Sequence, residues 1–228
     1  MEKAERWLAS TLDYEFNDPQ LFRQALTHRS SPGHSNERLE FLGDAVLGFV
    51  ITEIVFRMLP DADEGDLSRL RSSLVKDTSL AALASDLGLG DHLYLGGGER
   101  KSGGHRRESI LADALEALFG AVYMDAGFRA ASTVIEKVFA SRLTNLPDLS
   151  DLRDAKTRLQ EMLQARSMGL PEYDLVDVTG KAHKQSFQVR CSVPELDEST
   201  LGSGTSRRNA EQDAAGRMLL ALAGQSRG

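Results

Sequence analysis

The spacing of apolar residues changes once along this chain, near residue 150. Before that point apolar side chains recur every three or four residues, as in Leu39, Leu42 and Val46, which is the period of a helix with one buried face. After it, the runs 173–178 and 186–193 alternate apolar and polar residues, which is the period of a half-buried strand. The change of period predicts two folding units of different class.

A short polar stretch separates the two expected units. Residues 144–154 (TNLPDLSDLRD) lose the periodicity and place Pro147 among Asn, Ser and Asp, a composition typical of a connection. We therefore expect an all-α unit at 1–146, a linker at 147–152 and a small α+β unit at 153–224. A chain of 228 residues is long enough for two such units.

The second unit is expected to have the element order α-β-β-β-α. The first helix covers about 153–166, and the two alternating runs form strands joined through Gly180. Residues 200–204 supply a third strand. Ser206 is a suitable N-cap for a last helix that ends near Leu222.

Composition excludes several classes of protein. The chain has no run of about 18 apolar residues, so no membrane span is expected. Its start, MEKAERWLAS, mixes charged residues with short apolar pieces and lacks the apolar core of a secretory signal, so a cytoplasmic location is expected. The single cysteine, Cys191, has no disulfide partner, and no zinc-type Cys/His spacing occurs. Any metal is therefore expected on oxygen ligands.

The net charge of −7 is unevenly distributed. Residues 1–150 hold 23 acidic and 16 basic residues, whereas 151–228 hold eleven of each. Within the neutral part the basic residues cluster, since 181–190 and 201–210 contain Lys or Arg and no acid. A polyanionic partner for the second unit is therefore compatible with the negative total.

Acidic residues occur at helical spacing on two otherwise apolar segments. Glu37, Glu40 and Asp44 share one face of a predicted helix, and like charges at this spacing destabilise an isolated helix. Asp113 and Glu116 lie three residues apart among alanines and leucines. A solvated polar stripe and a metal site both remain open as interpretations of these acids. Mg²⁺ fits the second, because it takes oxygen ligands and suits phosphodiester hydrolysis.

The segment that carries these acids resembles the signature of the ribonuclease III family, and the chain downstream resembles a double-stranded-RNA-binding domain. The matching segments of the first unit are ALTHRS at 25–30, NERLEFLGDAVL at 36–47, EGDLSRLRSSLV at 64–75 and ESILADALEALFGAVYMDAG at 108–127. Those of the second are TRLQEMLQ at 157–164, GKAH at 180–183 and GSGTSRRNAEQDAA at 202–215. The resemblance covers nearly the whole chain.

The resemblance implies a metal site made of four carboxylates. Glu40, Asp44, Asp113 and Glu116 fall on the family's metal-site positions, with Asp44 and Glu116 in the catalytic roles. The implied cofactor is Mg²⁺, with Mn²⁺ as a substitute. Since all four acids are present, the resemblance favours an active enzyme.

Further residues match family positions whose role here has two interpretations. Glu37 and Glu64 match acids of the cleavage valley, and each is either part of the site or a solvated carboxylate. Phe41 matches an aromatic residue at a homodimer interface, the alternative being a core phenylalanine. We interpret His28 as a buried or capping histidine rather than a catalytic one.

RNA contacts are implied at both ends of the second unit and are possible in the first. The resemblance assigns duplex contacts to Thr157, Gln160, Glu161, Gln164, His183, Arg207 and Arg208. Two arginines in a first helical turn oppose the helix dipole, and a bound phosphate would account for them. In the first unit, basic residues around a glycine-rich loop form either a phosphate contact or a solvated edge: Arg100, Lys101, His105, Arg106 and Arg107.

The sequence thus predicts a homodimeric Mg²⁺-dependent endonuclease that cuts double-stranded RNA. The resemblance implies 5′-phosphate and 3′-hydroxyl ends with a short 3′ overhang, and processing of ribosomal RNA precursors and of some messenger and transfer RNAs. The alternative is a catalytically silent protein that binds double-stranded RNA, which the loss of any one metal-site acid would have favoured. A small-molecule hydrolase with an appended RNA-binding domain has no sequence feature in its favour.

Overall fold

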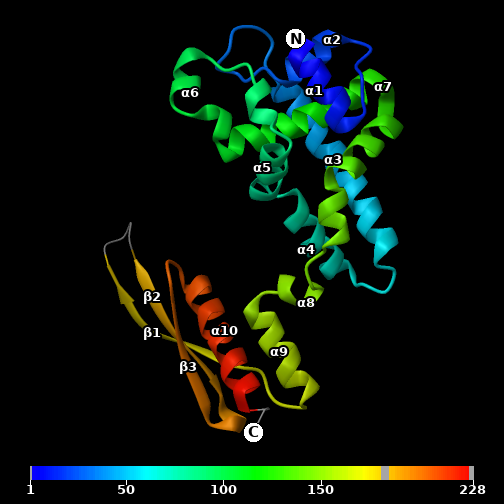
Figure 1. Cartoon of the computed structure of the whole chain (residues 1–228). Helices are drawn as coiled ribbons and strands as arrows, with labels where there is room; N and C mark the ends of the chain where they lie inside the picture. The colour runs from blue at the N-terminus through cyan, green and yellow to red at the C-terminus, as the bar shows by residue number, and fades with distance from the viewer. Residues whose placement is uncertain (1, 181–184, 226–228) are drawn as a thin grey trace. The chain divides into compact units, whose positions relative to one another are not determined.

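The computed structural model describes residues 2–180 and 185–225, and the chain divides into two compact units, Met1–Pro147 and Asp148–Gly228 (Figure 1). The described part of the first unit is helical, and the second combines helices with a three-stranded antiparallel sheet. The expected fold class, an all-α unit followed by a small α+β unit, is confirmed.

The first unit is built from seven α-helices in its described part. They are α1 (Glu2–Leu12), α2 (Pro19–Ala25), α3 (Glu37–Met58), α4 (Glu64–Val75), α5 (Asp77–Asp86), α6 (Gly97–Lys101) and α7 (Glu108–Thr144), with 3-10 turns at Leu89–His92 and Gly104–Arg106. Local signals set several helix starts: the Asp63 carboxylate accepts from the Asp66 backbone N–H, and Pro19 occupies the first turn of α2. Among the described residues, no helix combines the length and apolarity needed to cross a membrane.

Helices α3 and α7 cross at two glycines at the centre of this unit. A Cβ atom on Gly43 would lie 1.8 Å from the Glu116 carbonyl oxygen, and one on Gly120 would lie 2.1 Å from the Leu39 carbonyl oxygen. Only glycine, which has no Cβ atom, fits between the two backbones at these points. The crossing brings the N-terminal turns of α3 next to the first half of α7.

The core of the first unit lies around this crossing. Of the predicted helical stripe, Leu39 and Val46 are buried and Leu42 is half-buried. The largest fully buried side chains nearby include Phe22, Phe119, Phe139, Leu47, Ile51 and Leu115. Helix α7 is broken at Gly127, whose φ of 79° is a left-handed value that glycine adopts at little cost.

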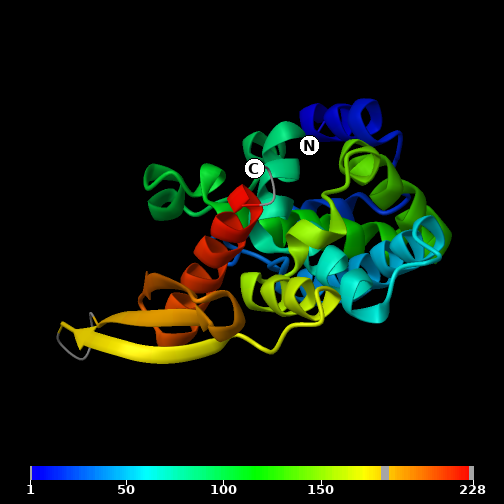
Figure 2. The same ribbon diagram turned by 90° about the horizontal axis from the view of Figure 1, so that it is seen from below.

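The second unit places helices on one face of a meander sheet (Figures 1 and 2). Its elements are α8 (Leu149–Leu152), α9 (Ala155–Ala165), β1 (Glu172–Thr179), β2 (Ser186–Val193), a 3-10 turn (Pro194–Leu196), β3 (Glu198–Gly204) and α10 (Arg207–Gln225). The strand order is β1-β2-β3, and Tyr173 pairs with Cys191, which pairs with Thr200. A bulge between Leu175 and Asp177 interrupts the first pairing.

The core of the second unit lies between the helices and this sheet. It contains Leu159, Leu163, Cys191, Val193, Ala214, Ala215, Met218 and Leu222. Ser206 caps α10 by accepting from the Asn209 backbone N–H, as expected. The stretch expected to be a linker contains the single turn α8, where Asp148 accepts from the Ser150 N–H; one turn is too short to show periodicity in a sequence.

Candidate active site and RNA-binding surface

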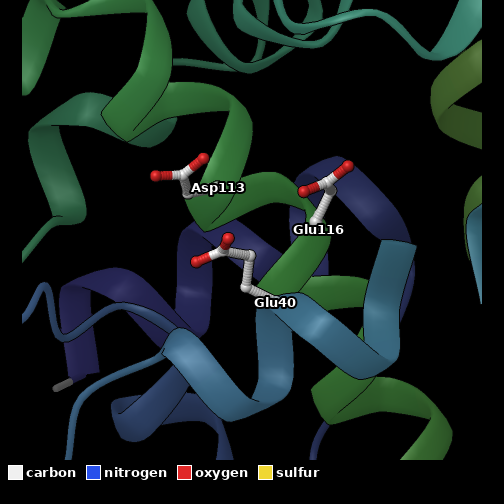
Figure 3. Close-up of side chains that lie close together, drawn as sticks. All are labelled: Glu40, Asp113 and Glu116. Atoms are coloured by element: carbon white, nitrogen blue, oxygen red, sulfur yellow. The ribbon is translucent and has the colours of Figure 1, made fainter. Parts of the chain in front are cut away.

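Three carboxylates from two helices converge in the first unit (Figure 3). Glu40 projects from α3, and Asp113 and Glu116 project from α7. One carboxylate oxygen from each lies within 4.8 Å of the others. The convergence follows from the Gly43–Gly120 crossing, which puts the first turns of α3 against this part of α7. Three carboxylates at this separation match the oxygen ligands that a hard divalent cation takes.

Burial and mutual repulsion raise the pKa values of all three carboxylates. Burial raises the pKa of Glu116 to about 8, with further increases from the charges of Asp44, Glu40 and Asp113. Burial and the nearby charge of Asp113 raise the pKa of Glu40, and burial and Asp77 raise that of Asp113. A divalent cation would reverse this effect, because it stabilises the ionised carboxylates.

Asp44 lies near these three carboxylates, but it is not one of the residues whose oxygens lie within 4.8 Å of one another. It is exposed on α3, one turn after Glu40, and its charge acts on both Glu116 and Glu40. Asp77, at the start of α5, also acts on Asp113 and Glu116. Sequence reasoning missed Asp77, because an acid in a first helical turn is common and its approach to α7 depends on tertiary packing.

The two other predicted acids lie in different surroundings. Glu37 contacts Arg29 and Ser35 and lines a polar cavity that also includes Glu40 and Asp113. Glu64, at the start of α4, accepts from Ser68 and lines a separate, mostly apolar pocket with Phe56. The structure therefore brings Glu37, and not Glu64, to the edge of the three-carboxylate cluster.

The polar cavity beside the carboxylates has a volume of about 550 Å³. Its wall includes His28, Arg29 and Arg107 in addition to the acids. Arg107 is the one member of the predicted basic edge among its lining residues, and it pairs with Glu99 at 2.8 Å. Arg100 donates to the Leu93 carbonyl oxygen, so part of the basic edge holds the local backbone together.

Phe41 is not a core residue. Its side chain is 82% exposed, next to the buried face of α3. Five other large apolar side chains on α3 and α7 are also exposed: Phe49, Phe56, Met58, Met124 and Phe128. Phe49 and Phe128 meet edge to face with ring centroids 5.4 Å apart, so the two helices share this surface. We call these six residues the apolar face; exposed apolar surface of this kind marks interaction sites.

In the second unit, two of the three predicted RNA-contact regions lie together. Thr157 is half-buried on α9, and the polar residues after it on the same face, Gln160, Glu161 and Gln164, are exposed. Arg207 and Arg208 are exposed in the first turn of α10. The third region, His183, lies outside the described residues.

A carboxylate bridge joins the N-terminal ends of α9 and α10. Glu211 accepts from Lys156 at 2.6 Å and from Arg207 at 2.9 Å, and the Lys156 backbone N–H donates to Gln212. The Lys156 ammonium also lies 4.3 Å from the centre of the Tyr173 ring. Lys156 was missed in the sequence because a single lysine on a helix gives no signal of its cross-helix partner. The bridge holds the Lys156 and Arg207 side chains together beside the predicted contact residues.

Two protein-family models match the chain. Residues 18–143 match the model described as ribonuclease-III-like, and residues 155–222 match the double-stranded RNA binding motif. The fold and the site therefore define a nuclease domain followed by a double-stranded-RNA-binding domain. The chain belongs to the ribonuclease III family and is an endoribonuclease of double-stranded RNA.

Curated relatives match over nearly the whole chain. Ribonuclease 3 of Methylococcus capsulatus is 53% identical over 100% of this chain and 99% of its own length. Ribonuclease 3 of Hahella chejuensis is 52% identical over 96% of this chain and 97% of its own length.

Solved structures match the first unit. Two solved structures of the nuclease domain of ribonuclease III from Campylobacter jejuni are 47% and 43% identical to this chain, with TM-scores of 0.56 and 0.58. They cover 59% and 63% of this chain and 97% of their own chains. One is described as showing structural flexibility in a region involved in dimer formation.

Proposed function

We propose that Glu40, Asp113 and Glu116, with Asp44 beside them, hold Mg²⁺ and use it to hydrolyse one phosphodiester bond of an RNA duplex. The observation that carries the proposal is the convergence of three carboxylate oxygens within 4.8 Å from two helices. The donor set fits Mg²⁺, or Mn²⁺ in its place, because every ligand is a carboxylate oxygen. Bound there, the ion would polarise the scissile phosphate and lower the pKa of an attacking water.

The residues of the chain have separate tasks in this reaction. Glu40 on α3 and Asp113 on α7 have carboxylate oxygens within 4.8 Å of each other and would hold the ion between the two helices. Glu116, the most strongly perturbed carboxyl, and Asp44, which remains exposed, are the proposed catalytic residues. Asp44 is accessible to solvent and substrate from the outer side of the cluster. Glu37 and Glu64 are proposed acids of the wider cleavage valley, and Glu37 is the nearer of the two.

The products we propose are 5′-phosphate and 3′-hydroxyl ends, with a short 3′ overhang made by two cuts. One site cuts one strand, and a duplex backbone has approximate two-fold symmetry, so paired cuts require two sites related by a two-fold axis. The apolar face supports such a homodimer. Phe41 at its end directly follows Glu40, so the proposed interface would begin beside the metal ligands.

Duplex affinity is assigned to the second unit. The proposed contacts are Thr157, Gln160, Glu161, Gln164, His183, Arg207 and Arg208. Exposed polar side chains on α9 and two arginines at the start of α10 suit an A-form duplex, which is bound by shape through 2′-hydroxyls and phosphates. The proposed substrates are ribosomal RNA precursors and some messenger and transfer RNAs, and the proposed location is the cytoplasm, where these RNAs are processed.

The test is cleavage of a labelled RNA duplex by the full chain with Mg²⁺, Mn²⁺, Ca²⁺ or a chelator. We expect Mg²⁺ to support cutting and the chelator to stop it. Glu116→Gln keeps the shape of the side chain but cannot bring a full negative charge to the ion, and it should lower the cleavage rate by about a hundredfold or more while duplex binding stays intact. Sequencing both ends of the products checks the proposed end chemistry.

Asp86→Asn is the matched control, since Asp86 is an exposed carboxylate on α5 outside the cluster and the cavity. It should cut at the parental rate. Cleavage that persists in the chelator, or in Glu116→Gln, would contradict the proposed site. Binding without cleavage in every metal would favour a silent double-stranded-RNA-binding protein instead.

A further inference from the structure

Residues 27–30 are hydrogen-bonded to residues 94–96, which directly precede α6. Thr27 forms an isolated parallel bridge with Tyr94, and the His28 backbone N–H donates to the Tyr94 carbonyl oxygen at 3.0 Å. The Gly96 N–H donates to the Ser30 hydroxyl at 3.0 Å. A Cβ on Gly96 would lie 2.3 Å from the Ser30 carbonyl oxygen, so this approach requires glycine. The proposed nuclease mechanism gives these residues no task.

The contacts of Ser30 determine which nitrogen of the His28 ring carries the proton. The Ser30 backbone N–H donates to Nδ1 at 3.2 Å, and the Ser30 hydroxyl lies 2.8 Å from the same atom. A nitrogen that accepts from a backbone N–H carries no proton itself, so in this tautomer the ring proton is on Nε2. Among the described residues Nε2 has no hydrogen-bond partner. The Nε2–H group of His28 is therefore available to donate a hydrogen bond to a ligand.

His28, which carries this donor, lines the 550 Å³ cavity. Glu40 and Asp113 line the same cavity. Arg29 lies in the same wall, and its nearest acid, Glu37, is 3.8 Å away with both side chains more than half exposed. Such a loose exposed pair contributes little to stability and can be exchanged for a better partner. Arg107 adds a second guanidinium, which is half-exposed.

The N-terminus of α7 meets the same cavity. Ser109 and Ile110, in the first turn of this helix, line it, and the N-cap residue Arg107 makes no side-chain capping hydrogen bond. The first N–H groups and the dipole of a long helix favour an anion. Together with His28 and Arg29, they place hydrogen-bond donors and positive charge in the cavity wall beside Glu40 and Asp113. The wall also contains Glu37 and Glu99, which pair with Arg29 and Arg107.

We propose that this cavity binds the phosphate next to the one that is cut, with His28 donating from Nε2 and Arg29 supplying a charged contact. The inference rests on the proposed function, because it takes the scissile phosphate to lie at Glu40, Asp113 and Glu116. Consecutive phosphates of a strand are one sugar apart, so a strand that crosses the carboxylates must put a neighbouring phosphate to one side. The part of the wall that carries His28 and Arg29 offers that phosphate a hydrogen-bond donor and a positive charge.

The contact would hold the strand in register rather than take part in bond cleavage. His28 and Arg29 are therefore positioning residues for the reacting phosphate, and Ser30 and Gly96 hold His28 in place. A second metal ion is a poorer occupant of this end, because His28 offers a hydrogen-bond donor there and both arginines are cations.

The test uses RNA duplexes in which one phosphate at a time, on either side of the cut, is replaced by an uncharged methylphosphonate. For the parent protein we expect kcat/KM to fall about tenfold or more at one neighbouring phosphate, the size of a lost charged hydrogen bond. In Arg29→Gln and in His28→Phe the same replacement should cost clearly less than in the parent, about threefold, because one of the two contacts is already gone. This loss of additivity identifies the residues that touch that phosphate.

Arg38→Gln and His34→Phe are the matched controls, since both side chains are exposed and lie outside the cavity wall. They should keep the full methylphosphonate penalty. If His28→Phe melts well below the parent, Arg29→Gln still gives the test, because the Arg29 side chain is 72% exposed. A full penalty in both cavity variants overturns the inference. Failure of the parent to cut the unmodified duplex would contradict the proposed function instead.

Discussion

The carboxyl of Glu116 shows how a proposed catalytic residue can oppose the stability of its own fold. Its pKa in the folded protein is about 8, against a usual value of 4.5, chiefly because it is buried. Below pH 4.5 the carboxyl is protonated in both the folded and the unfolded chain, so its raised pKa does not lower the free energy of unfolding. As pH rises toward 8 the unfolded chain ionises it and the folded chain does not, so the free energy of unfolding decreases.

We therefore expect Glu116→Gln to be more stable than the parent without metal, by about 1 kcal/mol or more at pH 8 and by much less at pH 4.5. Thermal melts of both proteins in a chelator across this range measure the difference. Added Mg²⁺ should stabilise the parent more than the variant, because only a ligand that binds the native state shifts unfolding. A difference that stays constant with pH would mean that Glu116 titrates normally.

At the residue scale the sequence predicted which acids share a helical face more readily than how they meet. The spacing of Asp113 and Glu116 indicated a shared helical face, and that is where they lie. Their approach to Glu40 depends on another helix, and helical period carries no information about cross-helix distance. For the same reason Asp77 was missed, and Asp44 was not distinguished from the acids of the three-carboxylate cluster.

At the scale of helices, the α3–α7 crossing positions the whole cluster. Gly43→Ala should destabilise the fold by about 1–3 kcal/mol or more, because the new methyl group would overlap the Glu116 carbonyl oxygen. It should also lower cleavage, since relief of the overlap displaces the backbone that carries Glu116. Urea unfolding and the cleavage assay measure the two effects.

Gly48→Ala is the control on the same helix. A Cβ at Gly48 meets nothing within 4 Å, so alanine should stabilise α3 by about 0.5–1 kcal/mol through its higher helix propensity. Cleavage should be unchanged. Equal effects of the two substitutions would show that helix propensity, and not the crossing, decides the outcome at Gly43.

Element type was predictable here because most elements keep one period over most of their length; β1 departs from it at the bulge between Leu175 and Asp177. The strands at 172–179 and 186–193 and the helices flanking them follow directly from alternation and helical spacing. Single events were not predictable: the break of α7 at Gly127 and the turn α8 each depend on one or two residues. A glycine in an apolar helix is compatible with a kink, a close crossing or open space, and Gly127, Gly43 and Gly48 show all three.

At the scale of the molecule, the division into two compact units predicts that each folds alone. A fragment ending at Leu146 should fold and keep weak metal-dependent cleavage, while its duplex affinity at physiological salt falls by about a hundredfold or more, because the Arg207 and Arg208 contacts are lost. Binding isotherms over a salt series compare fragment and full chain. Coinciding isotherms would mean that the second unit does not supply the affinity.

The apolar face leads to the last prediction, which concerns assembly. Phe41 is 82% exposed at one end of a surface that also includes Phe49 and Phe128, and burying it in a second copy would remove a large aromatic side chain from water. A glutamate at this position would have to be desolvated in the interface. Phe41→Glu should therefore sediment as a monomer at concentrations where the parent is dimeric, and its paired double-strand cuts should fall at least tenfold.

Leu220→Glu separates this effect from a general loss of exposed apolar surface, since Leu220 is 76% exposed on α10 of the other unit. It should leave both sedimentation and paired cutting unchanged. The helical circular dichroism and the melting temperature of Phe41→Glu serve as the folding control, because Phe41 lies in the helical first unit. A Phe41→Glu monomer that still makes paired cuts at the parental rate would show that one protomer cuts both strands, and the two-fold argument for the overhang would then fail.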